Sequence, residues 1–409
     1  MPEALPLNLV FVLILLGGWA AGRLMLRLKL PAVLGMLLFG VGLGALPLLA
    51  TWPEGLVVLE PFFTSFALVV ILLRAGLGLR RQTLHRIGPT ALAMAILPCL
   101  LEGITLTLAL RLIFGFEWAI SAMGAFMLAA VSPAVVVPAM LHLSESGYGK
   151  RNEVPTLILA GASVDDVLAI TLFAIFTRMA TAESVGVAEG LLLLPRALLL
   201  GLIPGWLLGL ALARWFNKAY TRIRATEKTI VLITLALMLV QVGDWLHSAA
   251  LLGVMTVGFL LLERAEPVAH ELAGKLARIW IFAEIFLFVL IGMQVEPAVA
   301  LQAGPRALLV IVLGLSARSL GVWISTSRSR MGRGERFFCV LAFLPKATVQ
   351  AALGGVALGL GLPGGDVLLA LAVLSILITA PLGLIGIRLA GPKLLDLAPP
   401  DLADPEDAD

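Results

Sequence analysis

Two adjacent acidic residues, Asp165 and Asp166, lie in the middle of a long apolar stretch that includes GASVDDVLAI. A charge at the centre of a membrane helix costs about 2.5–3.5 kcal/mol, so ionisable residues there are candidates for function. Neighbouring residues on a helix point about 100° apart, so the two carboxylates need separate partners or a water-filled cavity. The hydroxyl of Ser163, on the same helical face as Asp166, could add an oxygen ligand for a hard cation. We predict a site that holds either a proton or a metal cation; the alternative is a helix cap or turn.

A second pair of charges occupies corresponding places in two other apolar stretches. Glu102 lies 13 residues after Pro89, and Arg318 lies 13 residues after Pro305. Opposite charges at symmetric positions can pair across a pseudo-two-fold axis, which removes most of the cost of burying either one. We therefore predict a Glu102–Arg318 ion pair. The sequence also allows Arg318 to pair with Asp165 instead.

Two stretches, SPAVVVP and LPKATVQ, carry prolines inside apolar sequence. Proline removes a backbone donor, and in lipid the freed groups must be satisfied within the protein. Each stretch lies in the middle span of a three-helix unit, where inverted-repeat transporters place broken helices. We predict two broken helices that cross at the membrane midplane, supported by Ser132, Pro133, Pro138, Pro345 and Lys346. Lys346 would offset the negative end of a half-helix; the alternatives are simple kinks and an interfacial lysine.

Other polar residues in apolar stretches give weaker indications. Arg74 in ILLRAGLGL could reach the membrane interface or take part in gating, and Glu284 could serve a dimer contact or the ion pathway. Cys99 and Cys339 have no Cys or His neighbour at metal-binding spacing, so we interpret them as reduced packing residues.

The composition shows what must position these residues. The chain has 409 residues, of which 60% are hydrophobic and 13% charged, whereas soluble domains carry roughly 25% charged residues. The basic residues are dispersed, so nucleic acid is not an expected partner, and we find no cofactor motif. With about 20 residues for each membrane helix, the sequence predicts an all-α polytopic membrane protein. Its thirteen predicted spans are 5–22, 31–50, 59–79, 89–114, 117–143, 154–177, 191–213, 229–243, 247–263, 279–295, 305–327, 335–359 and 366–387.

The distribution of Lys and Arg predicts the orientation of these spans. Most of the 29 basic residues fall in alternate connections and at the C-terminal end. The intervening connections hold only Arg111, Arg178, Arg196 and Arg306. Because cytoplasmic loops are rich in Lys and Arg, we expect the N-terminus outside and the C-terminus in the cytoplasm. The first stretch lacks a small-residue cleavage pattern, which favours a membrane span over a signal peptide.

The spans are expected to group into functional parts. We predict dimerisation helices at 1–80 and 226–298, core transport helices at 81–180 and 299–392, a linker helix at 181–225, and a disordered acidic tail at 393–409.

The ordered set of motifs resembles a known superfamily. The segment SPAVVVPAML, followed by GYG and VPTLILAGASVDDVLAI and later by PKATVQAALG, is similar to the monovalent cation/proton antiporter superfamily. It resembles the branch of animal sodium/hydrogen exchanger-like domain proteins and their bacterial relatives. ILLRAGLGL and PCLLEG also fit, so the resemblance extends from about residue 60 to residue 390.

The resemblance implies a homodimer in which a core domain of six helices moves against a dimerisation domain, an elevator-like mechanism. It implies that Asp166 is the essential ion-binding carboxylate, that Asp165 is its partner, and that Glu102 and Arg318 form a core salt bridge. The expected partners are a monovalent cation, a proton and membrane lipid, in a bacterial inner membrane. Many electrogenic relatives carry Lys where this chain has Arg318, and Lys can release its proton during turnover whereas Arg cannot.

Several functions stay open at this stage. The aspartate pair favours electrogenic exchange of Na⁺ or Li⁺ for protons, but the sequence does not choose among Na⁺, Li⁺ and K⁺ or fix the stoichiometry. A sodium-coupled organic-anion symporter of related fold and an ion channel are the competing transport functions. An intramembrane aspartyl protease is excluded, because its aspartates must converge from separate helices and adjacent ones diverge.

Overall fold

The computed structural model describes residues 6–46, 54–78, 81–181, 187–246, 248, 250–295 and 297–397. These residues are helical almost throughout, which confirms the predicted all-α class. In chain order the elements are α1 (Leu7–Val12), the π-helical η1 (Leu13–Gly17), α2 (Gly18–Arg27), α3 (Ala32–Gly44), α4 (Glu54–Leu77), α5 (Arg81–Phe114), α6 (Trp118–Leu128), α7 (Pro133–Glu145), α8 (Val154–Thr181), α9 (Val187–Lys218), α10 (Ala225–Leu246), α11 (Ala250–Arg264), α12 (Glu266–Met293), α13 (Pro297–Ser325), α14 (Arg333–Ala342), α15 (Thr348–Gly354), α16 (Val356–Gly359) and α17 (Gly365–Leu394).

Within the described residues, nine helices are long and apolar enough to cross a membrane. The chain is therefore a polytopic membrane protein. Four of the predicted spans coincide with shorter helices instead: 31–50 with α3, 117–143 with α6 and α7, 247–263 with α11, and 335–359 with α14, α15 and α16. The count of thirteen spans and the orientation of the termini stay predictions.

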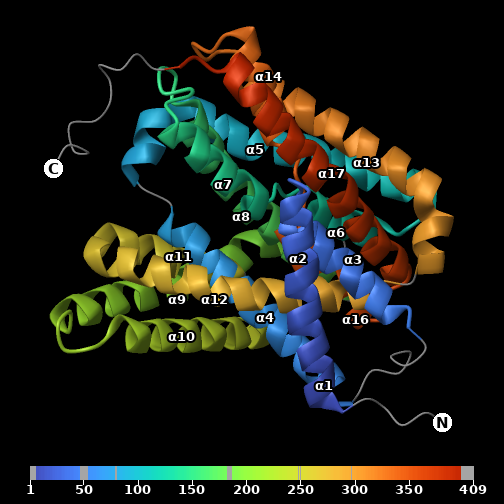
Figure 1. The fold of residues 1–409 in the computed structure, drawn as a ribbon, viewed down its shortest axis with the longest axis horizontal. Helices are drawn as coiled ribbons and strands as arrows, with labels where there is room; N and C mark the ends of the chain where they lie inside the picture. Colours follow the sequence, from blue (N-terminus) through green and yellow to red (C-terminus); the bar gives the residue numbers. More distant parts are fainter. Residues whose placement is uncertain are drawn as a thin grey trace.

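The helices form two groups that lie beside each other (Figure 1). In one group α5 packs against α13, α8 and α6, and α17 packs against α13, α14 and α15. In the other group α11 packs against α9 and α4, and α12 packs against α3 and α4. Segments from both halves of the sequence therefore build each group.

Several boundaries differ from the sequence-based expectations. α12 begins at Glu266 rather than near 279, because its first turns are amphipathic and a hydropathy pattern detects only the apolar remainder. The predicted disordered tail from 393 is wrong in its first residues. α17 continues to Leu394, Leu397 pairs with Tyr148, and the Gly149 N–H donates to the Asp396 carbonyl at 2.8 Å. These backbone contacts order the chain through residue 397.

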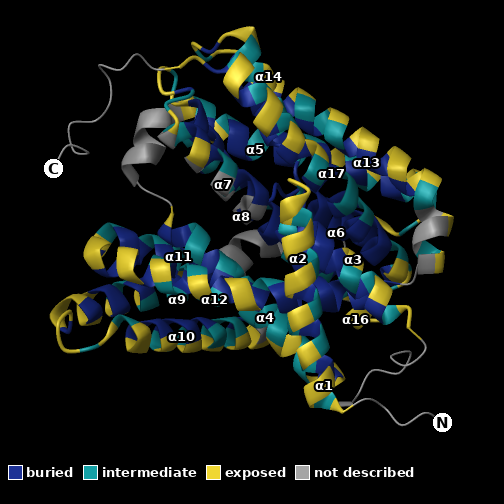
Figure 2. Ribbon diagram, viewed as in Figure 1, coloured by how far each residue is buried: buried dark blue, intermediate teal, exposed yellow. Residues whose placement is uncertain are grey.

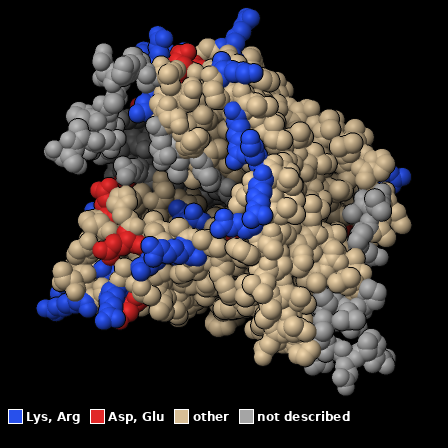
Figure 3. Space-filling view, in the orientation of Figure 1, with Lys and Arg blue, Asp and Glu red and all other residues tan. Residues whose placement is uncertain are grey.

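The outer helix faces carry large apolar side chains. Many exposed residues along α1, α2, α10 and α13 are visible in Figure 2. Val58, Leu112 and Trp245 are 75%, 81% and 72% exposed, as expected for faces that contact lipid rather than water. Lys and Arg side chains in Figure 3 lie at the top, in a column down the middle of the view and at the lower left, where Asp and Glu accompany them.

Glycines allow the helices of the second group to approach closely. A Cβ on Gly76 of α4 would lie 2.2 Å from the carbonyl oxygen of Met255 on α11, and a Cβ on Gly258 of α11 would lie 2.6 Å from a carbonyl oxygen of α4. Gly40 on α3 and Gly292 on α12 form an equivalent pair, with 2.3 and 2.4 Å to backbone oxygens. Such small-residue contacts are how membrane helices pack without a hydrophobic driving force.

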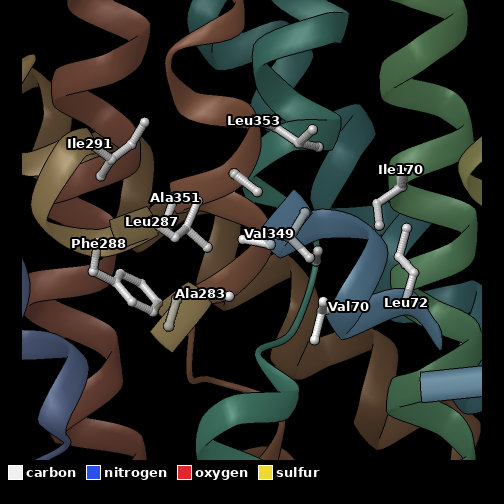
Figure 4. Packing of buried hydrophobic residues seen from close by; sticks show 14 of the residues in the cluster. Val70, Leu72, Ile170, Ala283, Leu287, Phe288, Ile291, Val349, Ala351 and Leu353 are labelled. Atoms are coloured by element: carbon white, nitrogen blue, oxygen red, sulfur yellow. The ribbon is translucent and has the colours of Figure 1, made fainter. Parts of the chain in front are cut away.

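The two groups meet through an apolar contact. Figure 4 shows Ala351 of α15 beside Leu287 of α12, and Val349 of α15 between α12 and Val70 of α4. All four side chains are no more than 5% exposed. α15, which directly follows the second interrupted segment, thus packs on α17 and α6 of its own group and on α12 and α4 of the other.

Candidate functional site

Asp165 and Asp166 lie within α8 and are 0% and 5% exposed. They face different surroundings, as expected for neighbours on a helix. Asp165 accepts hydrogen bonds from the Arg318 guanidinium at 3.2 and 3.3 Å and from the backbone N–H of Val131 at 3.1 Å. Asp166 Oδ1 has no hydrogen-bond partner among the described residues. One carboxylate is therefore held in an ion pair, and the other has acceptor capacity left.

Arg318, on α13, joins three elements. Its Nε donates to Glu102 on α5, its Nη2 donates to Asp165 on α8, and the same Nη2 donates to the carbonyl oxygen of Ala129. Its Cζ also lies 5.9 Å from the ring centroid of Phe343. The two pairings that the sequence left as alternatives, with Glu102 and with Asp165, occur together.

Lys346 also contacts Glu102. Its Nζ donates to Glu102 Oε2 at 2.7 Å, and the Lys346 side chain is 3% exposed. The sequence indicated a lysine that offsets the end of a half-helix and gave no signal for this ion pair. Glu102 thus balances two cations on one oxygen.

Both proline-containing stretches are interrupted helices. α6 ends at Leu128 and α7 begins at Pro133, while α14 ends at Ala342 and α15 begins at Thr348. Pro133 is the first residue of α7, a position where its missing N–H has no helical partner to lose. The helix is not interrupted at Pro138, because α7 continues through it, and the supporting role of Pro138 stays a prediction. The side chains of Pro133 and Pro138, like that of Ser163, lie outside the described part of the chain.

The two interruptions contact each other directly. The Ser132 N–H donates to the carbonyl oxygen of Pro345 at 2.8 Å, and the Thr348 N–H donates to Ser132 Oγ at 3.4 Å. Gln350 adds a longer connection, because its Nε2 donates to the carbonyl oxygens of Met127, Leu128 and Ala130 at 3.2, 3.3 and 2.9 Å. These carbonyls at the end of α6 would otherwise lack intrahelical partners.

Corresponding contacts recur in the two interrupted segments. The Val131 N–H donates to Asp165 on α8, 34 residues later, and the Lys346 N–H donates to the Thr379 hydroxyl on α17, 33 residues later. In each case an unpaired backbone donor of the interruption is satisfied by a polar side chain of the following long helix. Thr379 therefore makes at the second interruption the kind of contact that Asp165 makes at the first.

Comparison with known proteins identifies the family. Residues 11–389 match the family described as sodium/hydrogen exchanger, transmembrane. The chain belongs to this family. Sodium/hydrogen exchanger 9B1 of Macaca fascicularis is 31% identical over 414 residues, covering 96% of this chain and 80% of that protein. Human sodium/hydrogen exchanger 9B2 is 32% identical, covering 95% and 74%.

A solved structure supports the fold of this exchanger. The sodium proton antiporter MjNhaP1 of Methanocaldococcus jannaschii superposes with a TM-score of 0.75 over 93% of this chain and 97% of that one, at 19% sequence identity. The family match and the two animal relatives confirm the resemblance drawn from the sequence motifs. Because the similar proteins are exchangers, the expectation of a transporter rather than an enzyme is confirmed too.

Three residues of the candidate site gave little or no signal in the sequence. Gln350 and Thr348 lie in the stretch PKATVQAALG, where the one indication in the sequence is an amide side chain among apolar residues. Thr379 could not be found, because threonine in a membrane helix commonly bonds its own backbone. Arg74, which the sequence did single out, contacts α12 from α4: its Cζ lies 5.9 Å from the Trp280 ring centroid.

Proposed function

We propose that this exchanger exchanges Na⁺ or Li⁺ for H⁺ at Asp166, with Asp165 as the supporting carboxylate. The observation that carries the proposal is the charge balance of the buried network. Arg318 and Lys346 supply two positive charges, and their carboxylate partners Glu102 and Asp165 supply two negative ones. Ionised Asp166 then adds one uncompensated negative charge, which a proton or one monovalent cation neutralises.

This arrangement makes proton and cation compete for one carboxylate. A cation entering from one side displaces the proton of Asp166, and a proton from the other side displaces the cation. An ionised Asp166 with no cation bound is costly to bury. The site therefore changes sides only with a proton or a cation bound, which suppresses uncoupled movement.

The contacts of Asp165 favour one proton for each cation. Its oxygens are engaged by the Arg318 guanidinium and the Val131 N–H, both of which stabilise the ionised form. Arg318 keeps its proton throughout. We therefore propose electroneutral exchange in place of the electrogenic exchange that the aspartate pair alone suggested.

The proposed architecture follows from the matched contacts of the two interruptions. We propose that α5–α8 and α13–α17 are inverted repeats of a core transport unit that spans 81–180 and 299–392. The helices of 1–80 and 226–298 would hold a homodimer together, with 181–225 as the linker, the N-terminus outside and the core moving as an elevator. The compared relatives at about 30% identity are animal proteins, so a bacterial inner membrane stays a prediction.

Reconstitution of the full chain into liposomes with an internal pH dye tests the proposal. Addition of Na⁺ or Li⁺ outside should move protons in wild type and leave internal pH unchanged in Asp166→Asn, which keeps the shape of the side chain but not its charge. Adding K⁺ in the same experiment tests a K⁺/H⁺ antiporter on the same site. Wild-type-like exchange by Asp166→Asn would contradict the assignment of Asp166 as the carboxylate that binds the cation and the proton.

A further inference from the structure

Unpartnered polar atoms are concentrated where the interrupted helices meet. Among the described residues, four buried side-chain nitrogen or oxygen atoms have no hydrogen-bond partner: Asp166 Oδ1, Arg318 Nη1, Thr348 Oγ1 and Gln350 Oε1. All four residues are no more than 5% exposed. An unsatisfied buried polar atom costs about 1–3 kcal/mol, so such atoms are rare in folded proteins. The three oxygens among them can act as ligands, whereas Arg318 Nη1 is a donor on a permanent cation and cannot bind a second cation.

The chemistry of these atoms indicates what kind of ligand. Three of the four are oxygens, and they represent a carboxylate, a hydroxyl and an amide carbonyl. Hard cations bind oxygens of all three kinds, and a mixed set carries less negative charge than a cluster of carboxylates. A set with a single free carboxylate suits a monovalent cation.

The orientation of the Gln350 amide is fixed by its other contacts. Its Nε2 lies within hydrogen-bond distance of the carbonyl oxygens of Met127, Leu128 and Ala130. Since carbonyl oxygens only accept, this end of the amide must be the NH₂ group. Oε1 therefore points away from these carbonyls with its acceptor capacity unused.

Thr348 is connected to the aspartate pair through the first interruption. Its N–H contacts Ser132 Oγ at 3.4 Å, and the neighbouring Val131 N–H contacts Asp165 Oδ2 at 3.1 Å. Val131 and Ser132 of the first interruption thus lie between Thr348 and the aspartate pair. A threonine hydroxyl can donate as well as accept, so it can serve either a cation or the water that accompanies it.

We propose that Thr348 and Gln350 are cation ligands, whose neutral oxygens complete the shell of the ion that Asp166 balances and set the preference among Na⁺, Li⁺ and K⁺. This inference rests on the proposed function and adds the second interrupted helix to its binding site. The cation is then held by side chains of both repeats, so its presence joins α8 to α15.

Thr348→Val in the full-length protein tests the inference in liposomes, because valine keeps the shape and removes the hydroxyl. The KM for Na⁺ should rise about tenfold, the factor that corresponds to one neutral interaction, with little change in maximal rate. Thr348→Ser should restore the wild-type KM. Thr326→Val is the matched control: Thr326 is 0% exposed but its hydroxyl already donates to the carbonyls of Val322 and Trp323.

A binding readout separates this inference from the proposed function. Na⁺ should raise the thermal unfolding midpoint of the detergent-purified protein, as any ligand of the native state does. The rise should be smaller in Thr348→Val and in Gln350→Met. If Thr348→Val keeps both the KM and the Na⁺-dependent rise while wild type exchanges, the inference is overturned and the proposed function stands. If wild type moves no protons, the proposed function fails, and the Na⁺-dependent rise still decides whether Thr348 binds the cation.

Discussion

Glu102 is the acceptor that two buried cations share, so its removal tests the whole network. Its Oε2 accepts from Arg318 Nε and, at 2.7 Å, from Lys346 Nζ, and the three side chains are at most 3% exposed. Glu102→Gln keeps the size of the side chain but removes the charge. Arg318 retains Asp165, whereas the ammonium of Lys346 loses its carboxylate. Breaking one buried ion pair costs about 3–5 kcal/mol, and we expect the upper part of that range because two cations lose a partner.

The second substitution is chosen to remove the unmatched charge. Lys346→Met in the Glu102→Gln background takes away the buried ammonium, so the double variant should regain a large share of the lost stability. We expect a coupling energy above about 1 kcal/mol, within the range for residues in one network. The Glu102/Arg318 and Asp165/Arg318 cycles should both show coupling, because Arg318 contacts both carboxylates.

Thermal unfolding of the purified chain in detergent measures these cycles. Arg151 and Asp396 provide the matched control: their charged atoms are 3.9 Å apart, but the side chains are 81% and 61% exposed. Exposed pairs contribute about 0–1 kcal/mol, so this cycle should be close to additive. Additive losses, within about 0.5 kcal/mol, in the Glu102/Lys346 cycle would refute the shared-acceptor reasoning.

Three further predictions follow from the site and the packing. Asp165→Asn should lower both exchange and thermal stability, since Arg318 loses a carboxylate, but it should retain residual exchange in the liposome assay. If Asp165→Asn shows no exchange and Asp166→Asn stays active, the roles of the two aspartates are reversed. The rate of Na⁺-driven proton movement should not respond to an imposed membrane potential, and a clear response would contradict one-to-one exchange. Gly76→Ala should lower the thermal unfolding midpoint, because its Cβ would lie 2.2 Å from a backbone oxygen. Gly42→Ala is the control: its Cβ would have nothing within 4 Å, so the change should be neutral or stabilising by up to about 1 kcal/mol. Equal midpoints for the two variants would contradict the close packing of α4 on α11.

The charged residues of the site could be found from the sequence because burial makes them conspicuous. Asp165, Asp166, Glu102 and Arg318 each interrupt an apolar stretch, and a charge in such a stretch has few explanations other than function. Their spacing from prolines also indicated that Glu102 and Arg318 occupy matched positions. Both contacts of Arg318 were foreseen as alternatives, but nothing in the sequence could show that one guanidinium makes both.

The remaining contacts depend on tertiary packing between distant segments. Lys346 and Glu102 are 244 residues apart, and Gln350 lies 220 residues from the carbonyl of Ala130. Local patterns carry no information about such pairs. The predicted helix ends differ from the observed ones for another reason. Polar first turns, as at Glu266, extend a helix beyond the apolar part that a hydropathy pattern detects. The close glycine contacts were also invisible, because a glycine at a helix crossing looks like any other glycine in the sequence.

The apolar contact around α15 has a consequence for the temperature response of the molecule. Val349 and Ala351 meet Leu287 and Val70 through methyl groups, which have no preferred direction of approach (Figure 4). A shift of α15 along α12 would therefore replace one set of dispersion contacts by another of similar strength. If the core moves as proposed, side-chain bulk and the viscosity of the surrounding lipid resist that movement, so exchange should slow sharply when the bilayer stiffens on cooling. Ala351, which is 0% exposed, adds only one methyl group to the bulk of this contact.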